Sequence, residues 1–222
     1  MGAQASREVA VAAASAADEE PRRVDLRENT CWPYLPVDNQ GDQVSCVAHT
    51  FAMALYCALQ RNRPHDLYPD LAQVFERALR VSPDPSRGVS FEAVADGLMA
   101  RFAPDLRALG QTFAPIAAQQ AQKHLRHGIP VLVGYQVDDH IHAFHLDAEV
   151  CAARKYRLPL CDGHKVMSGH AVLLVGYDLD MQAYIARNSW GPDWGVDGHF
   201  FIDFRVFHDV TTVTDVWTLV PL

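Results

Sequence analysis

Helical and strand-like patterns occupy different halves of this 222-residue chain. In the first half, apolar residues recur at three- and four-residue intervals, the spacing of a helix with one buried face. In the second half, short runs of β-branched and aromatic residues are bounded by turn-forming residues, as is typical of strands. The predicted helices cover 46–60, 69–80, 90–101 and 115–127, and the predicted strands cover 129–137, 170–177, 182–188, 199–206 and 211–219. Helices followed by strands indicate an α+β fold.

A cysteine opens the first predicted helix. Cys46 precedes a long apolar run, and Gln40 lies six residues before it, next to a glycine. Backbone N–H groups and the dipole at a helix N-terminus favour a thiolate over a thiol. A thiolate beside an amide donor is half of a site that attacks carbonyl groups. Taken alone, a cysteine on an apolar helix is more often a small buried hydrophobic residue.

His170 and Asn188 supply the other half of such a site. His170 begins a buried-looking strand, and Asn188 ends another strand, just before a turn rich in Trp and Gly. They follow Cys46 by 124 and 142 residues, close to the Cys, His and Asn spacing of papain and cathepsins. With Gln40 and the segment 188–195, these residues make the chain resemble the papain-like (C1) family of cysteine proteases over about residues 24–220.

The resemblance implies a papain-like two-lobe fold. It predicts an N-terminal helical lobe and a C-terminal antiparallel β-barrel-like lobe, with the active-site cleft between them. The expected boundaries are a tail at 1–23 and a peptidase domain at 24–222, divided into lobes at 24–127 and 128–222. Family members usually carry a long inhibitory propeptide, which we do not expect in front of this domain.

The resemblance also assigns roles to the site residues. Cys46 would attack a peptide carbonyl to form a thioester, and His170 would hold the thiol proton, so that the resting pair is thiolate–imidazolium. Asn188 would orient the imidazole. Gln40 would help to bind the oxyanion, and Trp190 would shield the His–Asn hydrogen bond from water. The expected partner is a peptide or protein substrate, and no cofactor is expected.

Substrate-binding residues follow less directly from the resemblance. The backbone at Gly88 would pair with an extended substrate, although a loop glycine before a helix cap at Ser90 explains it equally well. Gly169 and Ala171 would face the specificity pocket, and Trp190 is the fourth candidate.

Three residues depart from the family pattern. Gln43 replaces a cysteine that forms a disulfide in many secreted members, and Val44 makes the loop before Cys46 bulkier. Val47 replaces the usual tryptophan after the nucleophile. Two alternatives therefore stay open: an inactive papain-like scaffold or binding protein, and an enzyme that passes the acyl group to amines or cleaves other amides.

The remaining cysteines leave the redox compartment open. Cys151 and Cys161 bracket a polar loop and are the candidate disulfide, whereas Cys31 and Cys57 either pair or stay reduced. The pattern is similar to the disulfide-poor branch of the family in bacteria and viruses. This leaves the localisation undetermined, with a slight preference for an intracellular or virion-associated protein.

Composition excludes some classes of partner. A formal net charge of −8 argues against nucleic-acid binding, and the absence of an 18-residue apolar run argues against a membrane span. Gly2 and Ser6 match a myristoylation pattern. A single acyl chain on Gly2 would be only a weak lipid anchor, and an ordinary flexible start explains these residues equally well. We expect a monomer.

A histidine-rich segment is a second candidate for a functional site. His140, His142 and His145 have residue types found in metal sites. Because the segment lies between two predicted strands, where the family has a variable loop, a solvated loop at the cleft edge is favoured. We therefore expect no metal.

Overall fold

The computed structural model describes residues 20–28, 37–62, 89–97, 107, 110–162 and 165–221. Helices and an antiparallel sheet are both present, and the predicted α+β class is confirmed. The helix expected at 69–80 lies outside the described residues, as do Gly2, Cys31 and Gly88.

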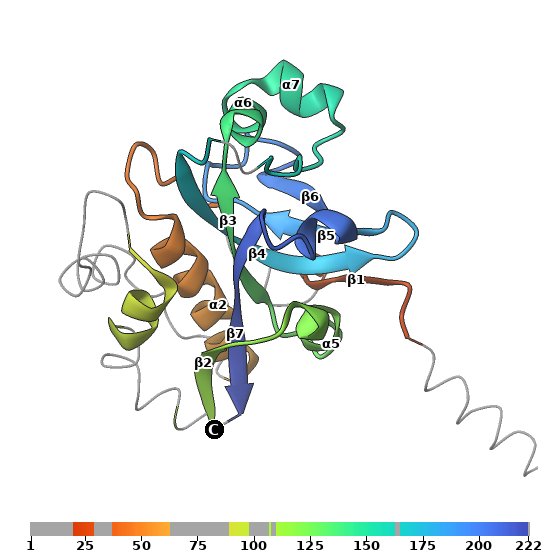
Figure 1. Ribbon diagram of the computed structural model, residues 1–222. Helices are drawn as coiled ribbons and strands as arrows, with labels where there is room; N and C mark the ends of the chain where they lie inside the picture. The colour runs from red at the N-terminus through yellow and green to blue at the C-terminus, as the bar shows by residue number, and fades with distance from the viewer. Residues whose placement is uncertain are drawn as a thin grey trace, which may run out of the picture.

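One antiparallel sheet organises the described part of the chain (Figure 1). Its strands are β1 (Arg23–Asp25), β2 (Gln111–Pro115), β3 (Val131–Val137), β4 (Ser168–Asp178), β5 (Ala183–Arg187), β6 (His199–Asp203) and β7 (Val213–Pro221). The strand order is β2-β7-β3-β4-β5-β6, and β1 pairs with β4. β3 and β4 are buried along most of their length, so they read as continuous apolar runs.

Helix α2 (Cys46–Asn62) packs against this sheet (Figure 1). Its fully buried Phe51 contacts Phe91, Phe113 and Trp217, and these aromatic contacts join the helix to β2, β7 and the helical residues 91–97. That second helical segment begins as expected, because Ser90 Oγ accepts a hydrogen bond from the Ala93 N–H at 3.2 Å. The shorter elements are η1 (Leu26–Glu28), η3 (Ala118–Gln120), α5 (Ala121–Arg126), α6 (Asp139–Leu146), α7 (Ala148–Ala153) and α8 (Phe204–Phe207).

Two predicted elements are wrong at one end. The helix expected at 115–127 is shorter, because Pro115 ends β2 opposite Trp217 and α5 starts only at Ala121. The strand expected at 199–206 ends at Asp203, after which the chain turns into α8. In both places pairing with a distant strand, which local periodicity does not encode, sets the boundary.

The loop expected around the three histidines is also wrong, because these residues form α6. Asp138 caps the helix by accepting from the Ile141 N–H at 2.9 Å, and its other carboxylate oxygen accepts from the Asp162 N–H at 2.7 Å. Ile141, Phe144 and His145 then share one buried face at helical spacing. Helices α6 and α7 lie beyond one end of β3 (Figure 1).

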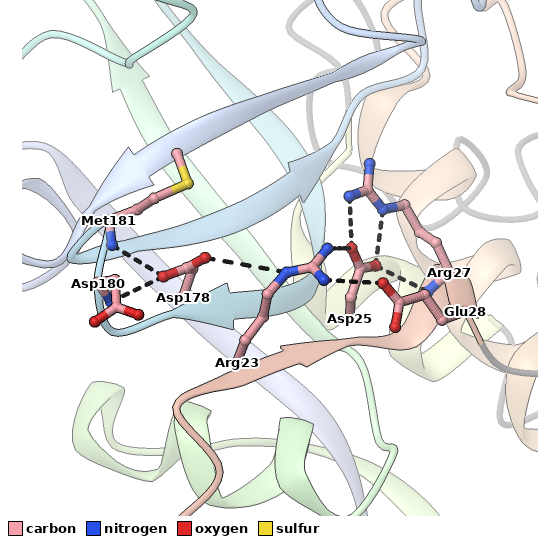
Figure 2. Close-up of polar contacts among 7 residues, drawn as sticks. All are labelled: Arg23, Asp25, Arg27, Glu28, Asp178, Asp180 and Met181. Atoms are coloured by element: carbon pink, nitrogen blue, oxygen red, sulfur yellow. Dashed lines mark hydrogen bonds and ion pairs between the residues drawn. The ribbon is translucent and has the colours of Figure 1, made fainter.

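A charged network ties β1 to Asp178, the last residue of β4 (Figure 2). Arg23 bonds to Asp25 and Glu28 at 2.8 and 3.0 Å and lies 4.0 Å from Asp178. Arg27 clasps both carboxylate oxygens of Asp25, at 2.8 and 2.6 Å. Burial disfavours the charged form of Asp25, but the hydrogen bonds and charge of Arg27 outweigh it and lower the pKa of that carboxyl.

β1 lies so close to β4 that one glycine is required. A Cβ added at Gly176 would lie 2.2 Å from the Val24 carbonyl oxygen, so we expect Gly176→Ala to push β1 off the sheet and lower the free energy of unfolding by about 1–3 kcal/mol. Denaturant unfolding measures this. Gly169→Ala is the control on the same strand, because its Cβ would meet only the Tyr135 carbonyl oxygen at 3.7 Å. Equal stability of the two variants would contradict the packing argument.

Candidate active site

Cys46 lines a cavity between the start of α2 and the sheet. The cavity has a volume of about 800 Å³, and its lining includes Cys46, His170, Gln40 and Gly169. Cys46 is partly exposed and is the first residue of α2, whereas the preceding Ser45 is buried. The sheet brings His170 to the same cavity, two residues after β4 begins.

His170 and Asn188 form a buried pair. His170 Nε2 lies 2.8 Å from Asn188 Oδ1, and the Ser189 N–H donates to the same oxygen at 2.9 Å. Since a backbone N–H needs an acceptor, the second bond identifies this amide atom as the oxygen. An amide oxygen only accepts, so His170 Nε2 carries a proton and Nδ1 is the ring nitrogen left to exchange one.

Gln40 is held against the Asn188 loop. Its backbone N–H donates to the Ser189 carbonyl oxygen at 2.8 Å, and the Ser189 hydroxyl donates to its side-chain oxygen at 2.6 Å. Gln40 Nε2 donates to the Gln43 carbonyl oxygen at 2.6 Å. The next residue, Gly41, has a φ of +56°, which suits glycine. This turn therefore fixes Gln40 beside the N-terminus of α2.

Aromatic rings enclose the His170 imidazole. Trp190 stacks on it with centroids 4.6 Å apart and planes at 29°, and Tyr135 meets it edge-on at 5.6 Å. His145 lies 5.4 Å from His170 and 4.6 Å from Trp190. Sequence reasoning missed Tyr135 and treated His145 as a loop residue. The available signal was the cap at Asp138 followed by a helically spaced apolar face.

Burial disfavours the charged form of both Cys46 and His170. It raises the pKa of the Cys46 thiol, although backbone hydrogen bonds from Ala171, Val47 and Cys46 itself oppose the shift. It lowers the pKa of His170 to about 4, against the opposing effect of the Asn188 hydrogen bond. Burial thus opposes the charged form of each group, and the thiolate–imidazolium resting pair expected from the sequence stays a prediction.

Comparison with known proteins relates the chain to one family. A family model described as "Papain family cysteine protease" matches residues 110–214. An uncharacterized peptidase C1-like protein of Acanthamoeba polyphaga mimivirus is 22% identical over 232 residues, which cover 88% of this chain and 73% of that protein. Xylellain, a cysteine protease from Xylella fastidiosa, shares the fold with a TM-score of 0.72 at 19% identity, over 94% of this chain and 89% of that one. Residues 110–214 thus match the papain family of cysteine proteases, and the chain shares the fold of a cysteine protease.

Shorter matches bear cathepsin names. Cathepsin B-like CP3 of Giardia intestinalis is 54% identical over 41 residues, 17% of this chain and 14% of that protein. Pro-cathepsin H of Bos taurus is 38% identical over 65 residues, 28% of this chain and 19% of that protein. These matches thus span less than a fifth of either cathepsin. Papain-family proteases are hydrolases, and the match to the family implies protein substrates.

The other candidate substrate-binding residues differ in whether they line the cavity. Gly169 lines the cavity. Ala171 is buried instead, and its backbone hydrogen bond reaches the Cys46 thiol. Trp190 stacks on His170. All three departures from the family pattern, Gln43, Val44 and Val47, line the cavity.

The predicted disulfide between Cys151 and Cys161 is wrong, because both residues are buried thiols in the structure. The Cys161 side chain hydrogen-bonds to Asp138, which helps to lower the pKa of that carboxyl. Cys151 is instead buried on the short helix α7. The Cys161 thiol thus bonds to the Asp138 carboxylate and not to Cys151. The local sequence around Cys161 gives no sign of this partner.

The cavity wall carries negative charge. Glu92 and Asp215 line it, and the part of the lining that the structure describes contains no Lys or Arg. Asp215 is half-buried and accepts from the Thr214 hydroxyl at 2.8 Å. A Cβ added at Gly134 would lie 3.1 Å from an Asp215 carboxylate oxygen, so the glycine leaves room for this side chain. Sequence reasoning missed Asp215, which comes near Gly134 through the pairing of β3 with β7.

The described residues contain neither a metal-binding cluster nor a membrane-spanning helix. In these parts of the chain, no group of three or more His, Cys, Asp or Glu side chains has an arrangement suited to holding a metal ion. No described helix has the length and apolar character needed to cross a bilayer.

Proposed function

We propose that this protein hydrolyses peptide bonds through Cys46, His170 and Asn188, with a thioester intermediate. The observation that carries the proposal is the buried hydrogen bond from His170 Nε2 to Asn188 Oδ1 at 2.8 Å, on the cavity that Cys46 also lines. It leaves His170 Nδ1 as the base of the proposed site.

The proposed reaction forms a thioester on Cys46 and then hydrolyses it. The Cys46 proton passes to His170 Nδ1 as the sulfur attacks the peptide carbonyl carbon, which gives a tetrahedral oxyanion. Collapse of this intermediate breaks the C–N bond, and His170 returns the proton to the leaving amine. Water then attacks the thioester with His170 as base, which releases the carboxylic acid and restores the thiol.

Two donors support an oxyanion site at the start of α2. The Cys46 N–H belongs to the first turn of the helix, where backbone donors lack intrahelical partners. Gln40 Nε2 uses one hydrogen on the Gln43 carbonyl oxygen, which leaves its second hydrogen for a ligand. Each such donor in an acyl-transfer site contributes roughly 3–4 kcal/mol to transition-state stabilisation.

The charge of the cavity supports a preference for cationic substrates. Asp215 and Glu92 both line the cavity, and the chain as a whole carries a formal charge of −8. A Lys or Arg side chain entering the cavity would gain a partner for its charge, whereas an acidic side chain would be repelled.

A peptide-library cleavage assay tests both the reaction and the preference. We expect hydrolysis, with Lys or Arg enriched over Asp or Glu at one position before the cleaved bond. Asp215→Asn should reduce that enrichment by roughly tenfold, the effect of losing one close charge pair. Glu92→Gln is the matched control, because Glu92 is exposed and should matter less. Absence of any Lys or Arg enrichment in the wild-type protein would refute the preference, and unchanged selectivity in Asp215→Asn would refute its assignment to Asp215. Both outcomes leave the reaction standing.

A binding scaffold is the second candidate, and the raised pKa of the Cys46 thiol favours it. A folded protein that binds library peptides without cleaving them would support the scaffold and contradict the peptidase. Adding an amine acceptor identifies the transferase alternative, since its product would be a new amide and not the free acid.

A further inference from the structure

A second histidine, His145, packs against His170, and packing alone does not explain a histidine at this position. His145 is only 8% exposed, and its Nε2 lies 3.0 Å from the hydroxyl oxygen of the fully buried Tyr135. Burying two polar groups costs free energy that their mutual hydrogen bond only offsets. Apolar side chains at both positions would fill this space without that cost, so the polar pair needs another explanation.

The fold directs both side chains at the imidazole. Tyr135 on β3 is the register partner of His170 on β4, and the pairing of β3 with β7 shifts between Gly134 and Tyr135. Such irregularities re-aim side chains and are common beside active sites. His145 comes from the last turn of α6, where its carbonyl oxygen accepts from Trp194 Nε1 at 3.0 Å.

These contacts restrain His170 from the sides that Asn188 does not reach. The Asn188 bond holds one ring atom, Nε2, whereas Trp190 covers a face and Tyr135 meets the ring edge-on. Trp190 in turn contacts His145 at 4.6 Å and Trp194 at 5.1 Å, both nearly perpendicular. The Tyr135–His145 bond thus joins the two side chains that brace the imidazole and its stacking partner.

We propose that Tyr135 and His145 form a positioning pair, which holds the His170 imidazole and Trp190 in the orientation needed for proton exchange with Cys46. The inference rests on the proposed peptidase function for its kinetic consequences. Burial, together with the nearby His170 and His142, keeps the pKa of His145 well below its ordinary value. A neutral His145 therefore adds no positive charge beside His170 when that ring takes up the thiol proton.

The test compares Tyr135→Phe, His145→Phe, the double variant and His145→Gln in peptide hydrolysis. Each Phe variant should lower kcat about tenfold, the scale of a small misplacement of a catalytic group, and change KM less than twofold. Because the pair acts as one unit, the double variant should lose no more than either single variant. His145→Gln retains a hydrogen-bonding group for Tyr135 and should recover most of kcat.

Tyr177→Phe is the matched control for stability. Tyr177 is buried on β4, and its hydroxyl donates to the Pro21 carbonyl oxygen at 2.9 Å, away from the cavity. We expect it to lower the melting temperature as Tyr135→Phe does, without lowering kcat. Wild-type kcat in Tyr135→Phe, or additive losses in the double variant, would overturn the pairing proposal while leaving the peptidase intact.

The rate of Cys46 alkylation by iodoacetamide tests the positioning pair independently of peptide hydrolysis. The rate reports how readily the thiol loses its proton to His170, and it needs no peptide substrate. If the wild-type protein cleaves no peptide, the proposed function fails, and slower alkylation in Tyr135→Phe than in Tyr177→Phe would still support positioning. Equal alkylation rates in those two variants would contradict it.

Discussion

Replacing Cys46 with alanine is expected to abolish peptide hydrolysis while leaving the fold intact. The substitution removes one sulfur atom from a partly exposed residue at the start of α2, so little packing is lost. Without the sulfur no thioester forms, and removal of a nucleophile from a catalytic unit costs on the order of 10⁴- to 10⁶-fold in kcat. Initial rates on a fluorogenic peptide, with circular dichroism as the folding check, measure both effects.

Covalent labelling provides an independent control for that loss. An epoxide-type thiol reagent should modify Cys46 in the wild-type protein, as peptide mapping by mass spectrometry would reveal. The other described cysteines, Cys57, Cys151 and Cys161, are buried and should remain unmodified in the folded protein. Hydrolysis by Cys46→Ala at the wild-type rate would exclude the proposed mechanism.

Acid is expected to destabilise the protein through its buried histidines, with His199 the clearest case. Burial lowers the pKa of His199 to about 4, and the charge of Arg27 adds to the shift. His199 Nδ1 lies 2.6 Å from the Asp197 carbonyl oxygen, whereas Nε2 is buried without a hydrogen-bond partner among the described residues. The folded state thus holds this imidazole neutral where the unfolded chain would protonate it.

The sign of the pH dependence follows from that difference. Between the unfolded pKa of about 6.5 and the folded pKa of about 4, the unfolded state binds more protons, so stability falls as the pH falls. From pH 7.5 to 4.5 this one group should remove about 2 kcal/mol from the free energy of unfolding. His145 and His170, whose pKa values burial also lowers, act in the same direction.

His199→Gln isolates the contribution of His199. The variant cannot take up a proton at this position, so its free energy of unfolding should fall by about 2 kcal/mol less than that of the wild type across the same pH interval. Denaturant unfolding at both pH values measures the difference. Asp25 and Asp138 have lowered pKa values, so their losses begin only below pH 4 and do not confuse the comparison. Parallel pH profiles for the two proteins would refute the assignment.

Much of the architecture was predictable because it is encoded locally. Helical spacing after Cys46 predicted α2, and the apolar runs around His170 and before Asn188 predicted β4 and β5. Side-chain periodicity reports which face of an element is buried, without reference to the element it packs on. The expected meeting of His170 with Asn188 relied instead on family resemblance, and the two side chains do lie 2.8 Å apart.

The sequence by itself determined which elements form and which reactive side chains begin or end them. Only the tertiary structure decided the surroundings of those side chains. Tyr135 faces His170 through strand register, Asp215 reaches the cavity through the β3–β7 pairing, and Cys161 bonds to Asp138 in place of Cys151. Each is a long-range contact, and it depends on how separate strands and helices pair in space, which local spacing along the chain does not record.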